Sequence, residues 1–383
     1  MNHARREDER PMQITAAVAR AREGDFRIET VELEDPRDDE VLVRIEAVGL
    51  CHTDLVFRDM ETEVTLPAVL GHEGAGVVER VGANVAKVRP GDKVLLTFRS
   101  CGTCVRCAAE HSAYCRHLPE LNFLGRRPDG SKAIRAGDEP VSSHFFGQSS
   151  FATHALAYER NLVRIDPALE SAIYAPLGCG VQTGAGAIMR SLACEAGSAL
   201  VVIGAGTVGL SAVMAGAVRG CAEVIVIEPK AARRALALEL GATHAIDPTA
   251  GDVAGQVRAI VPWGADYAFD TSGFVPALET AFGYLASHGV IGLVGVPAAA
   301  DAALPVPLVA AITFGFTVKG IIEGDSEPDS FIPELIDLHR QGRFPFDRLI
   351  QTYRLEDINR AVRDQHEGRC VKVVLLTGTE GGR

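Results

Sequence analysis

The chain has 383 residues, a hydrophobic fraction of 47%, a charged fraction of 23% and a formal net charge of -12. This length predicts two domains with large cores, and the acidic balance excludes a broad nucleic-acid surface, which needs clustered lysine and arginine. The charged stretch from Met1 to Met12 lacks the apolar core of a signal peptide, so we expect it to form a mobile tail. We therefore expect a cytoplasmic protein.

The N-terminal part carries short β-like runs separated by glycine and proline, at Val41 to Ile45, Gly76 to Arg80 and Lys93 to Leu96. This pattern predicts a compact, mostly β domain. The final part is expected to hold a helix at Ile332 to Arg340 and a strand at Val371 to Leu376.

From about Ser198 onward, apolar strand-like runs alternate with alanine-rich helical stretches such as Ala231 to Leu240. The expected strands are Ala199 to Ile203, Glu223 to Ile227, Tyr267 to Phe269 and Val290 to Val294. This alternation predicts βαβ units and a parallel sheet. The uncharged stretch from Ala196 to Val218 is long enough to cross a bilayer, but its five glycines favour a strand, a turn and a buried helix.

Four cysteines fall within fifteen residues, at Cys101, Cys104, Cys107 and Cys115. Thiolates this close together can surround one ion tetrahedrally, which is the closed geometry of a structural zinc site. A disulfide pair and an iron–sulfur cluster are the alternatives. The spacing favours zinc.

A glycine-rich turn follows an expected strand and opens an expected helix. It reads Gly204-Ala205-Gly206-Thr207-Val208-Gly209. Such a turn brings the backbone and a helix N-terminus close to a pyrophosphate. Glu228, at the end of the next apolar run, can bind both ribose hydroxyls and repel a 2′-phosphate, which favours NAD over NADP. Lys230 and Arg233 leave NADP open, and a core turn with a solvated glutamate is the alternative interpretation.

Three further segments complete a pattern, namely Cys51-His52-Thr53-Asp54, Gly71-His72-Glu73-Gly74 and Gly178-Cys179-Gly180. Together with the four cysteines and the glycine turn, in this order, they resemble the zinc-dependent alcohol dehydrogenases of the medium-chain dehydrogenase/reductase superfamily over nearly the whole chain. Within that family the chain is most similar to the aryl-alcohol (benzyl-alcohol) dehydrogenases, through Phe145 to Leu156, Pro176 to Ala187 and Glu323 to Ser326.

The resemblance implies an α/β fold in which a doubly wound Rossmann domain is inserted into a GroES-like, mostly β catalytic domain. The catalytic domain would comprise residues 1–180 and 323–383, with a structural zinc lobe at about 98–116, and the cofactor domain residues 181–322. The catalytic cleft would lie between the two domains. Members form dimers or tetramers, mainly through the cofactor domain.

The resemblance also implies residue roles. Cys51, His72 and Cys179 would hold the catalytic zinc with an open fourth position, giving two zinc ions per chain. Asp54 would orient His72, and Glu73 would sit behind the metal and enter its coordination during ligand exchange. Thr53 would take the proton of the substrate hydroxyl.

Other matched positions concern the ligands. Val294 to Val296 would lie along the nicotinamide and Lys372 near the pyrophosphate, while Phe98 and Phe151 would line the substrate cleft. Arg233, just beyond Glu228, is a further candidate for cofactor binding. If the resemblance is set aside, the same residues have simpler interpretations. Thr53 would be a local helix cap, Asp54 an acid in a turn, Lys372 a solvated surface lysine, and the two phenylalanines core residues. Cys194, Cys221 and Cys370 are expected to be buried thiols with no such role.

Two positions depart from the family pattern. Val56 stands where many relatives have a proton-relaying histidine, so the proton must leave through water or another base such as His52. His52 itself stands where many relatives have an arginine on the pyrophosphate, and a mostly neutral imidazole there predicts faster cofactor release.

The expected activity is therefore reversible, NAD-dependent oxidation of a primary alcohol, aromatic or allylic, to its aldehyde. A glutathione-adduct (formaldehyde-type) dehydrogenase or a short-chain aliphatic alcohol dehydrogenase is the alternative within catalysis, with Arg99 and Arg126 as cations for the adduct. Cys179 disfavours a polyol dehydrogenase, which commonly has glutamate as third ligand. A non-catalytic scaffold that keeps only a structural zinc is the rival from another class.

Overall fold

The computed structural model describes residues 11–299, 301–304 and 306–378. The chain divides into two compact units, of which unit 1 comprises the residues up to Cys179 and from Leu349 onward, and unit 2 runs from Gly180 to Arg348. Unit 2 is therefore inserted into unit 1. Most of the expected N-terminal tail lies outside the described residues, and Met12 already begins a strand.

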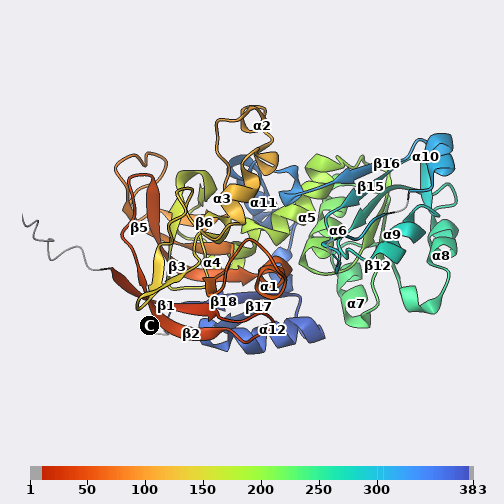
Figure 1. Cartoon of the computed structure of the whole chain (residues 1–383). Helices are drawn as coiled ribbons and strands as arrows, with labels where there is room; N and C mark the ends of the chain where they lie inside the picture. The colour runs from red at the N-terminus through yellow and green to blue at the C-terminus, as the bar shows by residue number, and fades with distance from the viewer. Residues whose placement is uncertain (1–10, 300, 305, 379–383) are drawn as a thin grey trace, which may run out of the picture. The chain divides into compact units, whose positions relative to one another are not determined.

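The strands of unit 1 form two sheets. The five-stranded sheet has the order β4 (Ala68–Val69), β1 (Met12–Ala19), β2 (Arg27–Leu33), β7 (Ile134–Ala136) and β8 (Glu139–Val141). The seven-stranded sheet has the order β10 (Leu162–Arg164), β6 (Lys93–Leu96), β5 (Glu73–Val81), β3 (Glu40–Leu50), β18 (Lys372–Leu376) and β17 (Ile350–Arg354), and β9 (His154–Tyr158) also pairs with β3. The C-terminal strand β18 is antiparallel to β3, so the C-terminal segment of unit 1 joins the sheet of its N-terminal segment (Figure 1).

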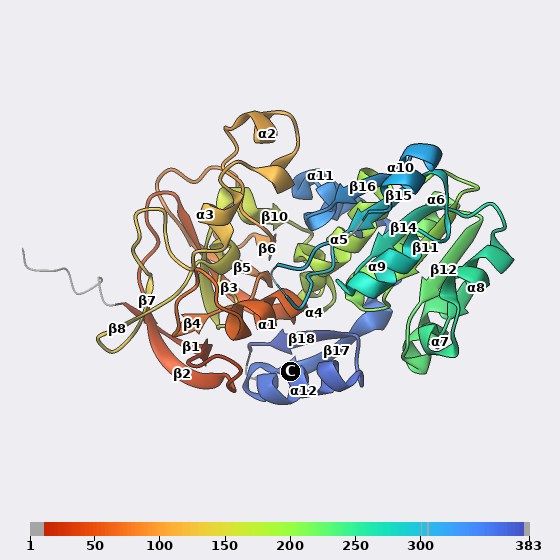
Figure 2. The same cartoon turned by 45° about the vertical axis from the view of Figure 1, so that its right-hand side comes forward.

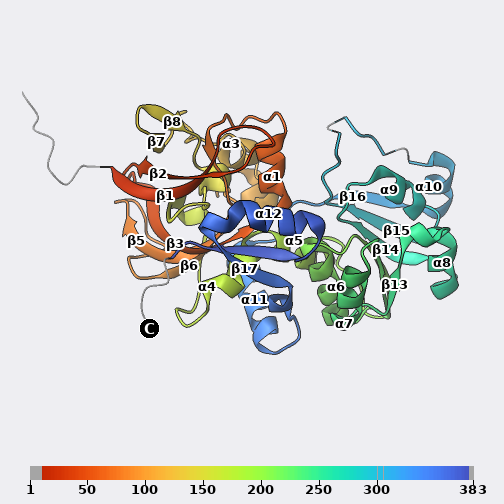
Figure 3. The same ribbon diagram turned by 90° about the horizontal axis from the view of Figure 1, so that it is seen from below.

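Short helices connect these strands. They are α1 (His52–Asp59), α2 (Val105–Ala108), α3 (Leu118–Asn122), α4 (Ser171–Tyr174) and α12 (Ile358–Glu367). Helix α2 lies on a loop that projects away from the strands of unit 1 (Figure 2). Helix α12 runs alongside β17 and β18 (Figure 3).

Unit 2 is built on a six-stranded parallel sheet. Its order is β13 (His244–Ile246), β12 (Glu223–Ile227), β11 (Ala199–Ile203), β14 (Ala265–Asp270), β15 (Leu285–Leu293) and β16 (Thr317–Gly320). The helices are α5 (Gly180–Gly186), α6 (Thr207–Arg219), α7 (Ala231–Glu239), α8 (Val253–Ile260), α9 (Val275–Ala281), α10 (Leu308–Phe314) and α11 (Pro328–Arg340). From β11 the chain adds strands outward to β13 at one edge, and from β14 it adds strands outward to β16 at the other edge. This strand order, with its switch point between β11 and β14, is that of a doubly wound Rossmann sheet.

The predicted fold class is therefore confirmed, and so is the strand–turn–helix interpretation of the uncharged stretch, which forms β11 and α6. No helix in the described ranges is long and apolar enough to cross a membrane. The second unit boundary falls after Arg348 rather than after residue 322. The reason is that α11 packs against α5 within unit 2, and pairing with unit 1 resumes only at β17.

A buried ion pair ties the two sheets of unit 1 to their connecting loops. Arg127, which is 2% exposed, donates from Nε to Glu40 Oε1 at 2.6 Å and from Nη2 to Oε2 at 2.9 Å. Its Nη1 binds Glu34 at 2.6 Å, and the ring of His144 and the hydroxyl of Tyr158 also contact Glu40 Oε1. Burial raises the pKa of Glu40, but the hydrogen bonds from His144 and Arg127 outweigh it and hold that pKa far below its ordinary value.

We expect Arg127→Ala to lower the free energy of unfolding by about 3–5 kcal/mol, because it leaves the buried Glu40 charge without its main partner. The contribution of the pair is present above the ordinary glutamate pKa of 4.5 and is lost as pH falls below it, because the folded-state pKa is depressed. Urea denaturation at pH 7 and pH 4 measures both effects. The matched control is Arg37→Ala, which removes an exposed pair with Asp129 and should cost no more than about 1 kcal/mol; equal losses in the two variants would contradict the expectation.

Candidate active site

Four side chains of unit 1 converge on one point. Cys51 caps the N-terminus of α1, His72 and Glu73 lie where β5 begins, and Cys179 ends a short helical turn at 175–178. One potential ligand atom from each lies within 4.8 Å of those of the others. The three residues predicted to bind the catalytic zinc are therefore brought together from distant parts of the sequence, and Glu73 joins them.

Asp54 fixes the orientation of this group. Its Oδ1 accepts hydrogen bonds from His72 Nδ1 at 2.8 Å and from the Gly71 amide at 3.0 Å, and its Oδ2 accepts one from the Cys51 amide at 2.9 Å. Asp54 and His72 are both fully buried. One carboxylate thus positions two predicted ligands, as the resemblance implied. The alternative interpretation of Asp54 as an exposed acid in a turn does not fit this burial.

The remaining nitrogen of His72 fits a metal ion. Its Nε2 is buried and has no hydrogen-bond partner among the described residues. Burial lowers the pKa of His72, but Asp54 and the Cys51 sulfur raise it well above its ordinary value, while the hydrogen bond from Cys179 lowers the pKa of Cys51. The group therefore favours a positive charge beside Nε2 and negative sulfur around it, and two sulfurs and one imidazole are a ligand set of catalytic zinc sites.

Glu73 is paired with Lys372. The ammonium Nζ lies 2.5 Å from Glu73 Oε2 and donates to the Leu50 carbonyl at 3.0 Å. Burial lowers the pKa of Lys372, but Glu73 and Cys51 raise it overall, so the side chain stays charged. Lys372 is 1% exposed, so the alternative interpretation of this residue as a solvated surface lysine is excluded. The contacts described for its side chain are with Glu73 and Leu50, which both lie in unit 1.

The proton-relay candidates lie on the first turn of α1. The Thr53 hydroxyl is 3.8 Å from Cys51 Sγ, whereas His52 is exposed. Val56 is half-buried one turn further along. The relay hydroxyl is therefore beside the metal-ligand group, with an exposed imidazole as its sequence neighbour.

Gln148 is a supporting residue that sequence reasoning missed. Its Nε2 donates to the carbonyls of His72 and Thr97 at 2.9 and 3.1 Å, and its Oε1 accepts from the Gly74 amide at 3.1 Å. The side chain is 2% exposed. It fastens the backbone on both sides of Glu73 to the residue after β6, and its only signal in the sequence was its place within Phe145 to Leu156, a stretch that carries the resemblance.

Aromatic rings pack directly on His72. Phe146 stacks on the imidazole with ring centroids 4.4 Å apart, and Phe145 meets it edge-on at 5.6 Å. The half-buried rings of Phe57 and Phe123 extend this cluster, at 4.8 Å from Phe145 and 5.4 Å from Phe146. Phe146 has a φ of 53°, a strained conformation for a non-glycine residue that is enriched at functional sites.

The two phenylalanines predicted for the substrate cleft are both buried. Phe98 and Phe151 are 2% and 0% exposed. Phe151 meets Phe26 edge-on with centroids 5.8 Å apart, and its ring lies against Gly71. This burial fits the core interpretation, whereas the rings that touch His72 come from the Phe145-Phe146 pair.

The four-cysteine group also assembles. Cys101, Cys104, Cys107 and Cys115 place their sulfurs within 4.8 Å of one another, with 3.9 Å between Cys101 and Cys107 and 3.6 Å between Cys104 and Cys107. Tetrahedral zinc with bonds of about 2.3 Å needs sulfurs about 3.8 Å apart. None of the nine cysteines, all of which lie in described residues, forms a disulfide. A backbone hydrogen bond from Arg116 lowers the pKa of Cys104 to about 5, whereas burial raises the pKa of Cys107 and of Cys115, so the arrangement of the four sulfurs carries the metal assignment.

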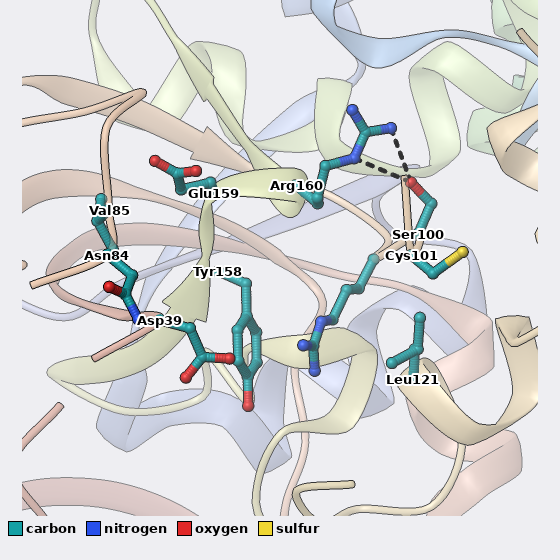
Figure 4. A pocket seen from close by; sticks show the side chains of 10 residues that line it. Asp39, Asn84, Val85, Ser100, Cys101, Leu121, Tyr158, Glu159 and Arg160 are labelled. Atoms are coloured by element: carbon teal, nitrogen blue, oxygen red, sulfur yellow. Dashed lines mark hydrogen bonds between the residues drawn. The ribbon is translucent and has the colours of Figure 1, made fainter. Parts of the chain in front are cut away.

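A pocket lies beside this lobe, with Ser100, Cys101, Leu121, Tyr158 and Arg160 in its wall (Figure 4). Arg160 donates from Nη2 and Nε to the Ser100 hydroxyl, at 3.0 and 3.3 Å. A guanidinium next to Cys101 would offset the negative charge of four thiolates around a divalent ion. The Arg99 guanidinium, also at this pocket, lies 3.2 Å from the centroid of the Tyr158 ring.

In unit 2 the glycine turn joins β11 to α6 as predicted. Gly204 has a φ of +94°, and a Cβ on Gly209 would lie 2.0 Å from the Gly204 carbonyl oxygen. A Cβ on Gly206 would meet no heavy atom within 4 Å in the described part of the chain, so the backbone there is open to a ligand. The turn thus fits a pyrophosphate at the N-terminus of α6, where Thr207 and Val208 form the first turn.

Glu228 lies at this turn. Its Oε2 accepts from the Ala205 amide and its Oε1 from the Lys230 amide, at 2.8 and 2.9 Å, and it is 4% exposed rather than solvated. Arg233 is half-buried in the first turn of α7. The amides of Val294 and Gly295 donate to the Asp270 carbonyl at the end of β14, and Val296 is 49% exposed. These predicted cofactor residues therefore follow the carboxyl ends of neighbouring strands, where open α/β sheets bind ligands.

The sequence matches two family descriptions, "Alcohol dehydrogenase GroES-like domain" over residues 37–167 and "Zinc-binding dehydrogenase" over residues 207–340. The chain is 47% identical to the geraniol dehydrogenase of Castellaniella defragrans, over 94% of this chain and 97% of that protein. The chain belongs to the zinc-dependent alcohol dehydrogenases of the medium-chain dehydrogenase/reductase superfamily. It is therefore an oxidoreductase, and its family implies zinc and a nicotinamide cofactor.

Solved structures of other alcohol dehydrogenases agree. An alcohol dehydrogenase zinc-binding domain protein from Burkholderia ambifaria matches with a TM-score of 0.93 and 48% identity over 96% of this chain and all of that one. The benzyl alcohol dehydrogenase from Acinetobacter calcoaceticus matches with a TM-score of 0.92 and 38% identity over the same shares. The predicted family and fold are confirmed.

We expect Cys104→Ser to lower the free energy of unfolding by about 4 kcal/mol or more, because it opens a closed metal site whose binding energy is folding energy. Differential scanning calorimetry and zinc content measure the loss. Cys370→Ser is the matched control, because that thiol lies outside both groups of potential metal ligands. A Cys104 variant as stable and as zinc-rich as the control would contradict the structural role.

Proposed function

We propose that this alcohol dehydrogenase reversibly oxidises primary aromatic or allylic alcohols to aldehydes, with NAD as the acceptor and two zinc ions per chain. The observation that carries the substrate class is the cluster of phenylalanine rings that begins on the imidazole of His72, because its half-buried members Phe57 and Phe123 leave ring surface for a ligand. An aromatic or conjugated substrate whose hydroxyl reaches the metal-ligand group would find apolar, polarisable surface there.

Zinc held by Cys51, His72 and Cys179 would supply the Lewis acidity that lowers the pKa of the alcohol hydroxyl, and NAD would supply the hydride acceptor. Asp54 keeps the proton of His72 on Nδ1 and so leaves Nε2 free to ligate. Glu73, held by Lys372, places a carboxylate behind the three ligands. Gln148 holds the backbone on which His72 and Glu73 sit.

The Thr53 hydroxyl receives the proton of the substrate in this proposal. Its distance of 3.8 Å from Cys51 Sγ supports the role, because it places the hydroxyl beside the residues that would hold the zinc. Val56 carries no ionisable group, so the proton continues to water or to the exposed His52.

The preference for NAD rests on Glu228. Its buried carboxylate is held at the glycine turn by two backbone amides, where it would accept the ribose hydroxyls and repel a 2′-phosphate. Lys230 and Arg233 are the cations nearest in sequence to the acid, and their side chains would have to outweigh it for NADP to be preferred.

A glutathione-adduct dehydrogenase is the second candidate, because S-(hydroxymethyl)glutathione dehydrogenases are also relatives, such as one from Komagataella pastoris at 32% identity over 95% of this chain. That substrate needs cations for its carboxylates. Arg99 is stacked on Tyr158 in the pocket beside the zinc lobe, and Arg126 is exposed. The rings on His72 therefore favour the aromatic or allylic alcohol.

A steady-state screen tests this choice with benzyl, cinnamyl, geranyl and short aliphatic alcohols and the glutathione adduct, each with NAD and NADP. We expect kcat/KM with NAD to be at least about 10²-fold higher for the aromatic and allylic alcohols than for ethanol, since apolar contacts supply a few kcal/mol. Phe123→Ala should lower kcat/KM for cinnamyl alcohol about tenfold and leave ethanol nearly unchanged. Cys179→Ser is the inactive control that should keep its fold; a best substrate that is ethanol or the adduct would contradict the proposal.

We further propose a cytoplasmic homo-oligomer, a dimer or tetramer joined through unit 2. Strand β16 is an edge of the parallel sheet, and α10 presents Leu308, Val309 and Ile312 at 71%, 79% and 83% exposure. Apolar surface of this kind beside an unpaired strand edge is typical of subunit interfaces.

Light scattering after size exclusion tests the assembly. We expect the mass of two or four chains for the wild type and a smaller particle for Ile312→Glu, because a charge on α10 cannot be buried without a partner. Trp263→Glu is the control, since Trp263 is 91% exposed on another loop. A monomeric wild type, or an equal effect of both changes, would overturn this interface.

A further inference from the structure

Two loops of unit 2, one before β11 and one after α6, are fastened side by side. The Arg219 guanidinium donates from Nε to the Cys194 carbonyl at 2.8 Å. The Gly197 amide donates to the Gly220 carbonyl, and the Ala222 amide to the Ser198 carbonyl, both at 2.8 Å. The segment that enters β11 therefore lies against the segment that leaves α6.

These two segments carry two thiols that meet. The Ser198 hydroxyl donates to Cys221 Sγ at 3.6 Å, and Cys194 and Cys221 are near enough that each thiol shifts the pKa of the other. Cys194 is fully buried, whereas Cys221 is partly exposed. The sequence predicted two buried thiols; Cys221 differs because it follows Gly220, where the chain turns at the end of α6.

The two thiols differ in acidity. The hydrogen bond from Cys194, helped by Ser198 and Arg219, lowers the pKa of Cys221 to about 7, although burial opposes it. The same hydrogen bond, together with burial, raises the pKa of Cys194 far above its ordinary value. A partly exposed thiolate with a second thiol on the adjoining segment is the arrangement of a reactive cysteine and its resolving partner.

We propose that Cys194 and Cys221 form an oxidation site that reacts with hydroperoxides to give a reversible disulfide within one chain. Both residues lie outside the two groups of potential metal ligands, so the reaction does not consume a metal-binding thiol. The inference goes beyond the proposed function and does not depend on it.

The reaction has two steps. The Cys221 sulfur attacks the peroxide, a sulfur–oxygen bond forms, the oxygen–oxygen bond breaks, and an alkoxide or hydroxide leaves. The Cys194 sulfur then attacks the Cys221 sulfenic acid, a sulfur–sulfur bond forms, and hydroxide leaves and takes up the Cys194 proton as water. The two thiols together lose two electrons, which the peroxide takes up.

The bridge would enclose the phosphate-binding part of unit 2. The loop from Cys194 to Cys221 contains β11, the glycine turn and α6. Oxidation would therefore tie together the two ends of the βα unit that is proposed to bind the dinucleotide, while a reducing dithiol would release them.

The test uses the zinc-loaded, full-length enzyme and hydrogen peroxide. After oxidation, remaining thiols are alkylated, the protein is digested without reduction, and peptides are mapped by mass spectrometry. We expect one cross-linked peptide pair that joins Cys194 to Cys221, forms before any zinc is released to a colorimetric chelator, and disappears with dithiothreitol. A cross-link that is absent, or that forms only after zinc release, would overturn the proposal.

Two variants assign the roles of the thiols. Cys194→Ser should accumulate a sulfenic acid at Cys221 that dimedone traps, whereas Cys221→Ser should give no dimedone adduct at Cys194. Cys370→Ser, a partly exposed thiol elsewhere, is the matched control and should keep the cross-link. Dimedone labelling of Cys194 in the Cys221 variant at the rate seen for Cys221 in the Cys194 variant would contradict the assigned order.

Discussion

The hydrogen bond of 2.8 Å between Asp54 and His72 is the constraint on which the metal-ligand group depends. It occupies Nδ1, so only Nε2 of the imidazole can face the two thiols. The same carboxylate holds the amides of Cys51 and Gly71, which ties the start of α1 to the turn before β5. One buried charge therefore sets the direction of a nitrogen ligand and the position of a sulfur ligand, and the low exposure of the group makes its electrostatic preference strong.

The residues around this group also hold the predicted ligands in position. Glu73 and Lys372 place an ion pair beside Cys51, His72 and Cys179, Gln148 fastens the backbone of His72, and the rings of Phe145 and Phe146 pack on His72. In unit 2, the open backbone at Gly206 and the held carboxylate of Glu228 supply the corresponding features for a dinucleotide. The chain thus divides the chemistry: unit 1 carries the metal ligands and unit 2 the nucleotide turn.

Features with local sequence spacing could be predicted, and features made by distant segments could not. The four cysteines and the glycine turn are close in sequence, so their spacing already determines their geometry. Gln148 and the Phe145-Phe146 pair act on His72, more than seventy positions away, and no periodicity indicates such a contact. Lys372 was predicted as a cofactor contact, and its pairing with Glu73 arises because β18 lies beside β3 in the seven-stranded sheet. The late unit boundary has a similar cause, since a helix such as α11 gives no signal of which unit it packs on.

The most direct test of the account is the zinc content of the purified enzyme and of His72→Ala, measured by plasma mass spectrometry on samples that circular dichroism shows to be folded. The account predicts two zinc ions per chain in the wild type and one in the variant, because the four-cysteine lobe keeps its ion when the imidazole is removed. One zinc ion in the wild type, or two retained without His72, would contradict a metal centre at Cys51, His72 and Cys179.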